Sequence, residues 1–556
     1  MYVQGRIIND YTTQQVSKIS KDYDLQLDQD LSVSTTLINK QEPIKSIFPL
    51  TQKERTLINL PLTSLISELS NGHVTAVEVT KAYVKSASYA HQLTNCLTEI
   101  LFQEAVDRAH ELDLQFQTNG GNTIGPLHGV PISVKDEFDI KSVRTTLGLV
   151  SRADDDVISV NSPNVEILIN AGAIIIAKTA VPIGAFNRKT FNNLFGVTCS
   201  SFGADLNPGG STGGEASLVS MKGSALGIGS DLGGSIRQPC AFSGLFGLRP
   251  TSLRVPHLNQ HSVVPGLESL RGVNGPIGRD IDTLRLYMRT ILSSEPWRLN
   301  PHVVPLPWNE DAAAAAAAAD FDLNEGVTIA VLRSDHLVVP TPPIQRAIEE
   351  VVSTFLSKKV QIIEVPEDIV LILQNLSVLA GQFMGSSGCG TLISEIEKSG
   401  EDVPYLSSLK SSKDLKTSEL WGKHIERDAN VSKFLHWWDQ NNITAMLAPV
   451  TAQAYLFQKS DLVDHTYGPF VNVLDFPSVT FPVTKIKSVD YEYIAPEDQQ
   501  LTKDSEFVLN EFLQTSGADK ARFINNIPVN LQLLGFKFQE ERLLKMADTL
   551  LKSLNS

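Results

Sequence analysis

The chain carries NPGGSTGGE at residues 207–215, followed by SDLGGSIR at residues 230–237. Each stretch places a serine directly after a pair of glycines, with Ser211 in the first and Ser235, 24 residues later, in the second. Upstream, GVPISVK at residues 129–135 ends an alternating apolar run with Lys135. Two serines in glycine turns and a lysine at the end of a strand indicate a hydrolase with Ser–Ser–Lys chemistry.

The second glycine turn supplies what attack on an amide requires, namely a nucleophile and donors for the developing oxyanion. Glycines allow a tight backbone in which successive N–H groups point at one place. We therefore predict that Ser235 attacks the substrate carbonyl. The backbone amides predicted to hold the oxyanion are those of Leu232, Gly233, Gly234 and Ser235.

The lysine is predicted to act as the base. Val130, Ile132 and Val134 alternate with a period of two, which places Lys135 at the end of a short strand. A lysine can accept a proton only when it is neutral, and burial lowers the pKa of a lysine. We therefore predict a relay in which Lys135 deprotonates Ser235 through Ser211 and returns the proton to the leaving amine.

Other motifs fail on their context. Residues 209–213 satisfy the G-x-S-x-G pattern, but that motif needs a strand directly before its serine, and residues 200–208 are typical of a loop. Gly227 and Gly229 resemble a dinucleotide loop whose third glycine is misplaced, at Gly233. The chain has no H-E-x-x-H motif and its histidines are scattered. We therefore expect neither a metal nor a cofactor.

Composition excludes several classes of function. The net charge of −15 argues against a nucleic-acid partner, because binding phosphates requires clustered Lys and Arg. The four cysteines lie far apart without a C-x-x-C pair, which is typical of free thiols in a reducing compartment. The chain has neither a signal-peptide pattern at its start nor a run of about 18 apolar residues. These features predict a cytoplasmic location and no membrane partner.

Alternating helical and apolar segments predict an α/β fold. A capping box at Thr75–Glu78 opens one helix, and the predicted helices and strands then follow in turn. Helices are expected at residues 104–114, 165–171 and 343–357, and strands at residues 173–177, 360–365 and 445–450. Lys178 and Thr179 are expected to end the first of these strands. The Ala-rich insertion at residues 311–320 is predicted to have no function.

Residues 129–251 resemble the amidase signature family. This resemblance implies a single large α/β fold at residues 56–556, with a central mixed β-sheet covered by helices on both faces, and an N-terminal arm at residues 1–55. It implies that Ser235 forms the acyl-enzyme and that Lys135 is the base. It also implies that Ser211 bridges them after a cis peptide bond and that residues 232–235 hold the oxyanion.

Flanking stretches resemble the fungal acetamidases within this family. They include QLTNC at residues 92–96, PLPW at residues 305–308 and PVNLQLLG at residues 528–535. The sequence of residues 183–189 departs from that usual in acetamidases, and Ala185 stands where a larger residue is common. Because this segment approaches the acyl group in the family, Ala185 is predicted to contact the substrate.

The resemblance implies a serine amidase that hydrolyses a small carboxylic amide to carboxylate and ammonia. Three alternatives remain within the same fold. The first is the glutamine-hydrolysing subunit of a tRNA-dependent amidotransferase, although the acidic charge and the acetamidase-like flanks argue against it. The second is a catalytically silent scaffold. The third is a lipid-amide hydrolase, which no membrane-anchoring segment supports. The resemblance also allows a homodimer.

Overall fold

The computed structural model describes residues 2–19, 49–309, 326–460, 467–494, 501–515 and 517–554. The Ala-rich insertion at residues 311–320 lies outside these ranges. The strands are β1 (Leu97–Ile100), β2 (Pro131–Lys135), β3 (Ile174–Thr179), β4 (Phe191–Asn192), β5 (Gly196–Val197), β6 (Leu206–Asn207), β7 (Leu226–Asp231), β8 (Phe246–Arg249), β9 (Val273–Gly278), β10 (Thr328–Val331), β11 (Gln361–Glu364), β12 (Ala445–Pro449), β13 (Leu456–Phe457), β14 (Ser478–Lys485) and β15 (Pro528–Leu534).

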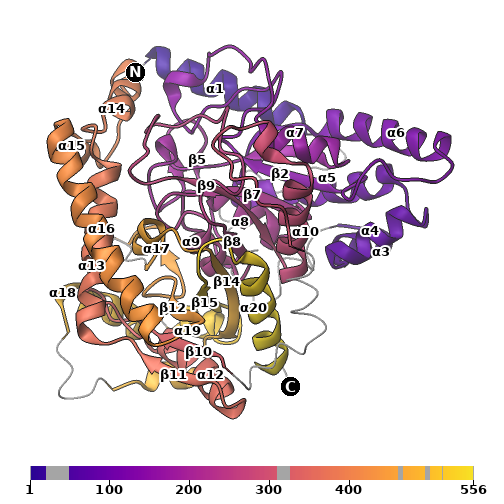
Figure 1. Ribbon diagram of the computed structural model, residues 1–556. Helices are drawn as coiled ribbons and strands as arrows, with labels where there is room; N and C mark the ends of the chain where they lie inside the picture. The colour runs from indigo at the N-terminus through magenta and orange to yellow at the C-terminus, as the bar shows by residue number, and fades with distance from the viewer. Residues whose placement is uncertain are drawn as a thin grey trace.

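The helices surround the strands (Figure 1). They are α1 (Tyr2–Ser17), α3 (Gln52–Asn59), α4 (Leu62–Ser70), α5 (Ala76–Thr94), α6 (Phe102–Thr118), α7 (Pro163–Asn170), α8 (Gly213–Ser220), α9 (Arg237–Ser243), α10 (Ile281–Ser293), α12 (Pro342–Ser357), α13 (Glu367–Met384), α14 (Gly390–Ser399), α15 (Leu406–Lys410), α16 (Thr417–Gln440), α17 (Pro469–Leu474), α18 (Lys503–Leu513), α19 (Gly517–Phe523) and α20 (Glu540–Leu554).

One mixed sheet of 11 strands organises the described part of the chain, in the order β1-β3-β2-β7-β9-β8-β14-β15-β12-β10-β11. Strand β2 is parallel to both β3 and β7, whereas β9 runs antiparallel to β7. Strands β14 and β15 pair antiparallel in the middle of the sheet. The predicted α/β class, with a central mixed sheet covered by helices on both faces, is confirmed.

The two faces of the middle strands have different chemistry, because successive side chains of a strand point to opposite sides. Val479 and Phe481 of β14, with Leu531 and Leu533 of β15, belong to the large apolar core that also includes residues of α10, α12 and α20. Four of the alternate residues are polar, namely Ser478, Thr480, Asn530 and Gln532, and Gln532 hydrogen-bonds to Arg237 of α9. The sheet therefore has one large apolar core on one face, and on the other face a second apolar core, packed by α13, α16 and α17, beside a buried polar network.

The predicted elements are found close to where they were expected, with one instructive difference. The Thr75 capping box opens α5, as predicted. Strand β3, however, continues through Lys178 and Thr179, which were expected to end it. Both residues are buried, and each has a polar partner that makes this burial tolerable. Lys178 pairs with Asp136 at 2.8 Å, and the Thr179 hydroxyl donates to Glu215 at 3.0 Å. Buried partners therefore extend the strand beyond its apolar run.

The N-terminal helix α1 packs against this framework. In α1, Tyr11 and Gln15 both donate to the carboxylate of Glu99 on β1. Helices α13 and α16 lie side by side at one edge of the molecule, on the left in Figure 1. In the ranges that the structure describes, no helix has the length and apolarity needed to cross a membrane.

Candidate active site

Lys135 is the last residue of β2, and its side chain is only 1% exposed. Its Nζ donates to Oγ of Ser211 at 2.8 Å and to Oγ of Ser230 at 2.7 Å. Strands β2 and β7 are parallel neighbours, which explains why Ser230, near the end of β7, lies beside Lys135. The structure thus brings the predicted lysine and the first predicted serine into direct contact.

Ser211 follows a cis Gly210–Ser211 peptide bond, as the family resemblance implied. Gly209 has a φ of 84°, in the left-handed region that favours glycine. Thr212 then leads into α8, and its hydroxyl donates to the backbone carbonyl of Ser230 at 3.3 Å. The turn is therefore fastened to the same strand end that contacts Lys135.

Ser235 lies in the turn between β7 and α9 and is half-buried. Gly234 has a φ of 113°, which a residue with a side chain rarely adopts. The backbone carbonyl of Ser235 accepts from the N–H of Thr212 at 3.3 Å. This hydrogen bond holds the two serine turns next to each other.

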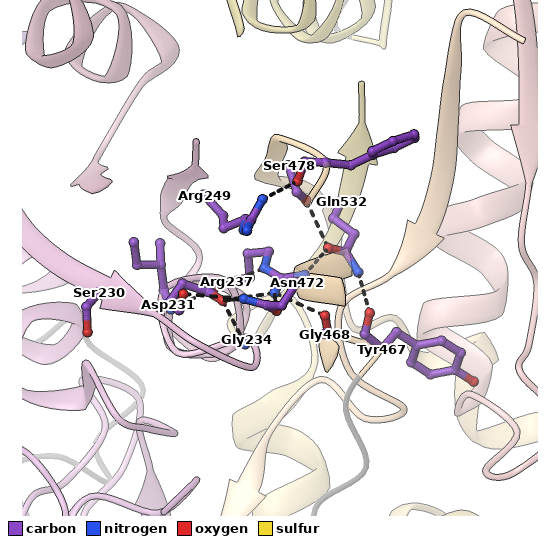
Figure 2. Close-up of polar contacts among 12 residues, drawn as sticks. Ser230, Asp231, Gly234, Arg237, Arg249, Tyr467, Gly468, Asn472, Ser478 and Gln532 are labelled. Atoms are coloured by element: carbon purple, nitrogen blue, oxygen red, sulfur yellow. Dashed lines mark hydrogen bonds and ion pairs between the residues drawn. The ribbon is translucent and has the colours of Figure 1, made fainter. Parts of the chain in front are cut away.

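A buried ion pair, whose residues do not line the cavity, holds the turn that carries Ser235 (Figure 2). The Asp231 carboxylate accepts from the N–H groups of Gly234 at 2.9 Å and Ile236 at 3.1 Å. Arg237 donates to both oxygens of the same carboxylate at 3.0 Å. Burial alone would raise the pKa of Asp231, but the charge and hydrogen bonds of Arg237 outweigh burial and hold it well below its usual range. Asp231 and Arg237 therefore form a fully buried salt bridge next to the Ser235 turn.

Helix α17 and strand β15 complete this network (Figure 2). Asn472 of α17 accepts from Arg237 at 2.6 Å and donates to Asp231 at 2.9 Å. Gln532 of β15 accepts from Arg237 at 3.2 Å and donates to the carbonyl of Pro449 at 2.7 Å. Two segments that are remote in sequence thereby support the turn that carries Ser235.

Carboxylates surround the lysine. Burial lowers the pKa of Lys135, while Glu137, Asp231 and Glu215 oppose this shift. Glu137 is the nearest of these in ion-pair geometry, with Oε2 at 3.4 Å from Nζ of Lys135. Burial raises the pKa of Glu215 to about 8, although its hydroxyl partners and Lys135 act in the opposite direction. Burial therefore shifts Lys135 toward its neutral form, and the three carboxylates oppose that shift.

A cavity of about 400 Å³ brings most of the predicted site together. Its lining includes Lys135, Ser211 and Ser235, together with Ala185 and Leu232. Its outer wall comes mainly from the loop at residues 253–272, between β8 and β9. This volume is in the range of pockets that take small organic ligands.

Two predicted oxyanion residues lie in the same turn but differ in their surroundings. Gly233 is half-buried, and a Cβ added to it would lie 3.8 Å from Met384 of α13. Gly234 is buried, and its N–H donates to the carboxylate of Asp231 at 2.9 Å. This hydrogen bond shapes the turn, and the assignment of the Gly234 amide to the oxyanion stays a prediction.

Sequence reasoning missed Ser230, Glu137 and the cavity loop. Ser230 stands inside the quoted SDLGGSIR stretch, but its contact with Lys135 depends on the pairing of β2 with β7. Glu137 lies two residues after Lys135, where a turn brings its carboxylate back toward the amine. No spacing in the sequence indicates either contact. The described residues contain no group of three or more His, Cys, Asp or Glu arranged to hold a metal ion.

Comparison with known proteins defines the class. The Amidase family model matches residues 78–544. The chain is 32% identical over 520 residues to the acetamidase of Aspergillus oryzae, covering 90% of each chain. It is 31% identical over 528 residues to the acetamidase of Emericella nidulans, covering 91% of each. Among solved structures, a fatty acid amide hydrolase matches with a TM-score of 0.85 and 28% identity, over 99% of this chain and 95% of that one.

These matches confirm the resemblance inferred from the signature stretch. The chain belongs to the amidase family, and it is a hydrolase that acts on amides.

Proposed function

We propose that this protein is a serine amidase that hydrolyses a small carboxylic amide to carboxylate and ammonia through an acyl-enzyme. The observation that carries the proposal is the 2.8 Å contact between Lys135 Nζ and Ser211 Oγ, in a cavity that Ser235 also lines. A nucleophile becomes competent when a nearby base can take its proton. The buried lysine supplies that base, and the bridging serine connects it to Ser235.

The first half of the reaction forms the acyl-enzyme. Lys135 takes a proton from Ser211 while Ser211 takes the proton of Ser235, and Oγ of Ser235 bonds to the amide carbon. The carbonyl π electrons move to oxygen, giving a tetrahedral oxyanion. When the C–N bond breaks, the proton returns through Ser211 to the leaving nitrogen, which departs as ammonia. The second half repeats these steps with water as the nucleophile and releases the carboxylate.

The oxyanion is assigned to backbone donors in the Ser235 turn. The proposed donors are the amides of Leu232, Gly233, Gly234 and Ser235, of which the Gly234 N–H also donates to Asp231. Removing a single oxyanion donor costs about 10² to 10³ in kcat in other enzymes. The shape of this turn is therefore as important to the proposal as the nucleophile itself.

Ammonia release by the purified chain tests the proposal. The substrates are acetamide, longer aliphatic amides, benzamide and glutamine, each compared with Ser235→Ala and with Ser220→Ala as a matched serine control outside the cavity. We expect turnover of simple amides, loss of it in Ser235→Ala and no change in Ser220→Ala. A sulfonyl fluoride should add its sulfonyl mass to Ser235 and not to the Ser235→Ala protein. Release from glutamine alone would instead favour the amidotransferase subunit, and full activity in Ser235→Ala would reject the mechanism.

Three other predictions accompany this function. They are a homodimer, a cytoplasmic location, and a division into an N-terminal arm at residues 1–55 and an amidase domain at residues 56–556. The fungal acetamidase relatives, which align with about 90% of the chain, support a unit of this size. Light scattering of the purified chain, microscopy of a tagged chain and truncation at residue 55 test the three predictions in turn.

A further inference from the structure

Glu137 joins the lysine to the wall of the cavity. Its Oε2 lies 3.4 Å from Nζ of Lys135, and its Oε1 accepts from Nε2 of Gln260 at 2.9 Å. The residue is 7% exposed, and that exposure is to the cavity that it lines. One buried carboxylate thus contacts both the proposed base and the loop that closes the pocket.

The position of this carboxylate is fixed by the chain around it. The N–H of His261 donates to the backbone carbonyl of Glu137 at 3.0 Å, and Phe138 forms a β-bridge with Gln260. Gln260 also exchanges side-chain hydrogen bonds with Asn274 of β9. These backbone contacts hold the segment of Glu137 against the segment of Gln260. Glu137 therefore has little freedom to move away from Lys135.

The other charged groups that face Lys135 are engaged elsewhere. The negative charge of Asp231 is balanced by the positive charge of Arg237, which donates two hydrogen bonds to its carboxylate. Glu215 accepts from the hydroxyls of Ser133 and Thr179 and carries a raised pKa. His257 lines the cavity, and desolvation lowers its pKa below 6.5, so it is neutral near pH 7. Glu137 is therefore the carboxylate whose charge acts most directly on the lysine.

We propose that Glu137 is a positioning residue that holds Lys135 beside Ser211 and sets the lower pH limit of catalysis. This inference rests on the proposed function, in which Lys135 acts as a base. A base must be neutral, yet a carboxylate at this distance favours the ammonium form. Glu137 therefore counteracts the effect of burial on the pKa of Lys135. The higher pKa moves the acid limb of the pH–activity profile to higher pH.

The decisive variant is Glu137→Gln, which removes the charge and keeps an oxygen that can accept from Gln260 or Lys135. An opposite charge at such a distance typically shifts a pKa by about one to three units. We expect the acid limb of kcat/KM to move to lower pH by about that amount, with a smaller effect on the alkaline plateau. Glu137→Ala should move the limb in the same direction and lower the plateau further, because it also releases the side chain of Lys135.

Gln260→Leu is the matched control for the structural role. It breaks the tie to the cavity loop and leaves the carboxylate beside Lys135, so it should raise KM without moving the acid limb. The pH dependence of Ser235 labelling by a sulfonyl fluoride provides a second readout that does not need turnover. Both variants of Glu137 should show the same limb by labelling as by turnover.

The outcomes separate this inference from the proposed function. An acid limb that stays in place or moves to higher pH in Glu137→Gln, by both readouts, would overturn the role of Glu137. Equal shifts in Gln260→Leu and Glu137→Gln would reduce Glu137 to an anchor for the loop and also overturn it. Failure of the proposed function would appear differently, as turnover and labelling that survive in Ser235→Ala.

Discussion

Arg237 donates two hydrogen bonds of 3.0 Å to Asp231, and both side chains are fully buried. The same carboxylate accepts from the amides of Gly234 and Ile236, on either side of Ser235. The turn that carries Ser235 is therefore shaped by an ion pair whose residues do not line the cavity. Substitutions of Asp231 or Arg237 should therefore alter the turn that carries Ser235.

Asp231→Asn should both destabilise the protein and lower its activity. The change leaves the Arg237 guanidinium buried without its counter-charge, and breaking such a pair typically costs about 3–5 kcal/mol. It also replaces one of the two oxygens that order the turn. Urea unfolding should show the loss of stability, and kcat should fall more than KM rises.

Arg237→Lys is the companion variant. It keeps a positive charge but loses the planar fork that reaches Asp231, Asn472 and Gln532 together. Its cost should lie below that of Asp231→Asn. Unfolding midpoints equal to that of the unmodified chain in both variants would show that the pair does not support the turn.

Ser230→Ala should lower kcat without unfolding the protein. The change deletes the 2.7 Å acceptor of Lys135 and leaves the contacts with Ser211 and Glu137. A net contribution of about 1 kcal/mol for one hydrogen bond corresponds to a fall of roughly fivefold. Steady-state kinetics on the best amide, beside the inert Ser220→Ala, measures it. A kcat within error of the control would remove Ser230 from the site.

Ala185→Leu should narrow the range of acyl groups. Ala185 lines the cavity with a φ of 52°, so a longer side chain at this position takes space that the substrate would occupy. A filled pocket discriminates by about 1–3 kcal/mol per misplaced group, or roughly 10–200-fold. We expect kcat/KM for benzamide to fall by at least tenfold and that for acetamide to change little.

Ala185→Gly is the control for the backbone, since glycine adopts a positive φ without cost. It should keep or widen the acyl range. A parallel loss of acetamide and benzamide turnover in Ala185→Leu would mean that the backbone was distorted instead of the pocket being filled.

The strands and the turns of the candidate site were predictable where local signals were strong. The alternation that ends at Lys135 correctly predicted a buried strand, and two glycine pairs marked the turns that carry Ser211 and Ser235. The Thr75 capping box likewise fixed the start of a helix. In each case, residues within a few positions of one another determine the local structure.

Apart from Glu137, whose contact depends on the local turn after Lys135, the missed contacts join segments that are distant in the sequence. Ser230 reaches Lys135 because two strands align in register, and Arg237 is held by Asn472 and Gln532, which lie more than 200 positions away. The extension of β3 through Lys178 depends on its buried partner Asp136. Single-sequence patterns contain no information on such pairings, so these contacts could not be inferred.

Glu215→Gln should change how stability depends on pH. Glu215 is fully buried in α8, where the hydroxyls of Ser133 and Thr179 donate to it at 2.6 Å and 3.0 Å. Burial raises its pKa from 4.5 to about 8 in the folded chain. Between these two values the folded protein keeps a proton that the unfolded chain has lost. The contribution of Glu215 to stability is therefore full below about pH 4.5 and declines as the pH rises to about 8.

Urea unfolding of the unmodified chain and of Glu215→Gln at several pH values isolates this contribution, because every other titrating group is common to both. The amide cannot ionise, so the variant should gain stability relative to the unmodified chain as the pH rises, by an amount on the order of 5 kcal/mol in total. The difference between the two proteins should be constant above about pH 8, where Glu215 is ionised in both states. A difference that does not change from pH 5 to pH 9 would show that Glu215 is already ionised when folded, with Lys135 as its counter-charge.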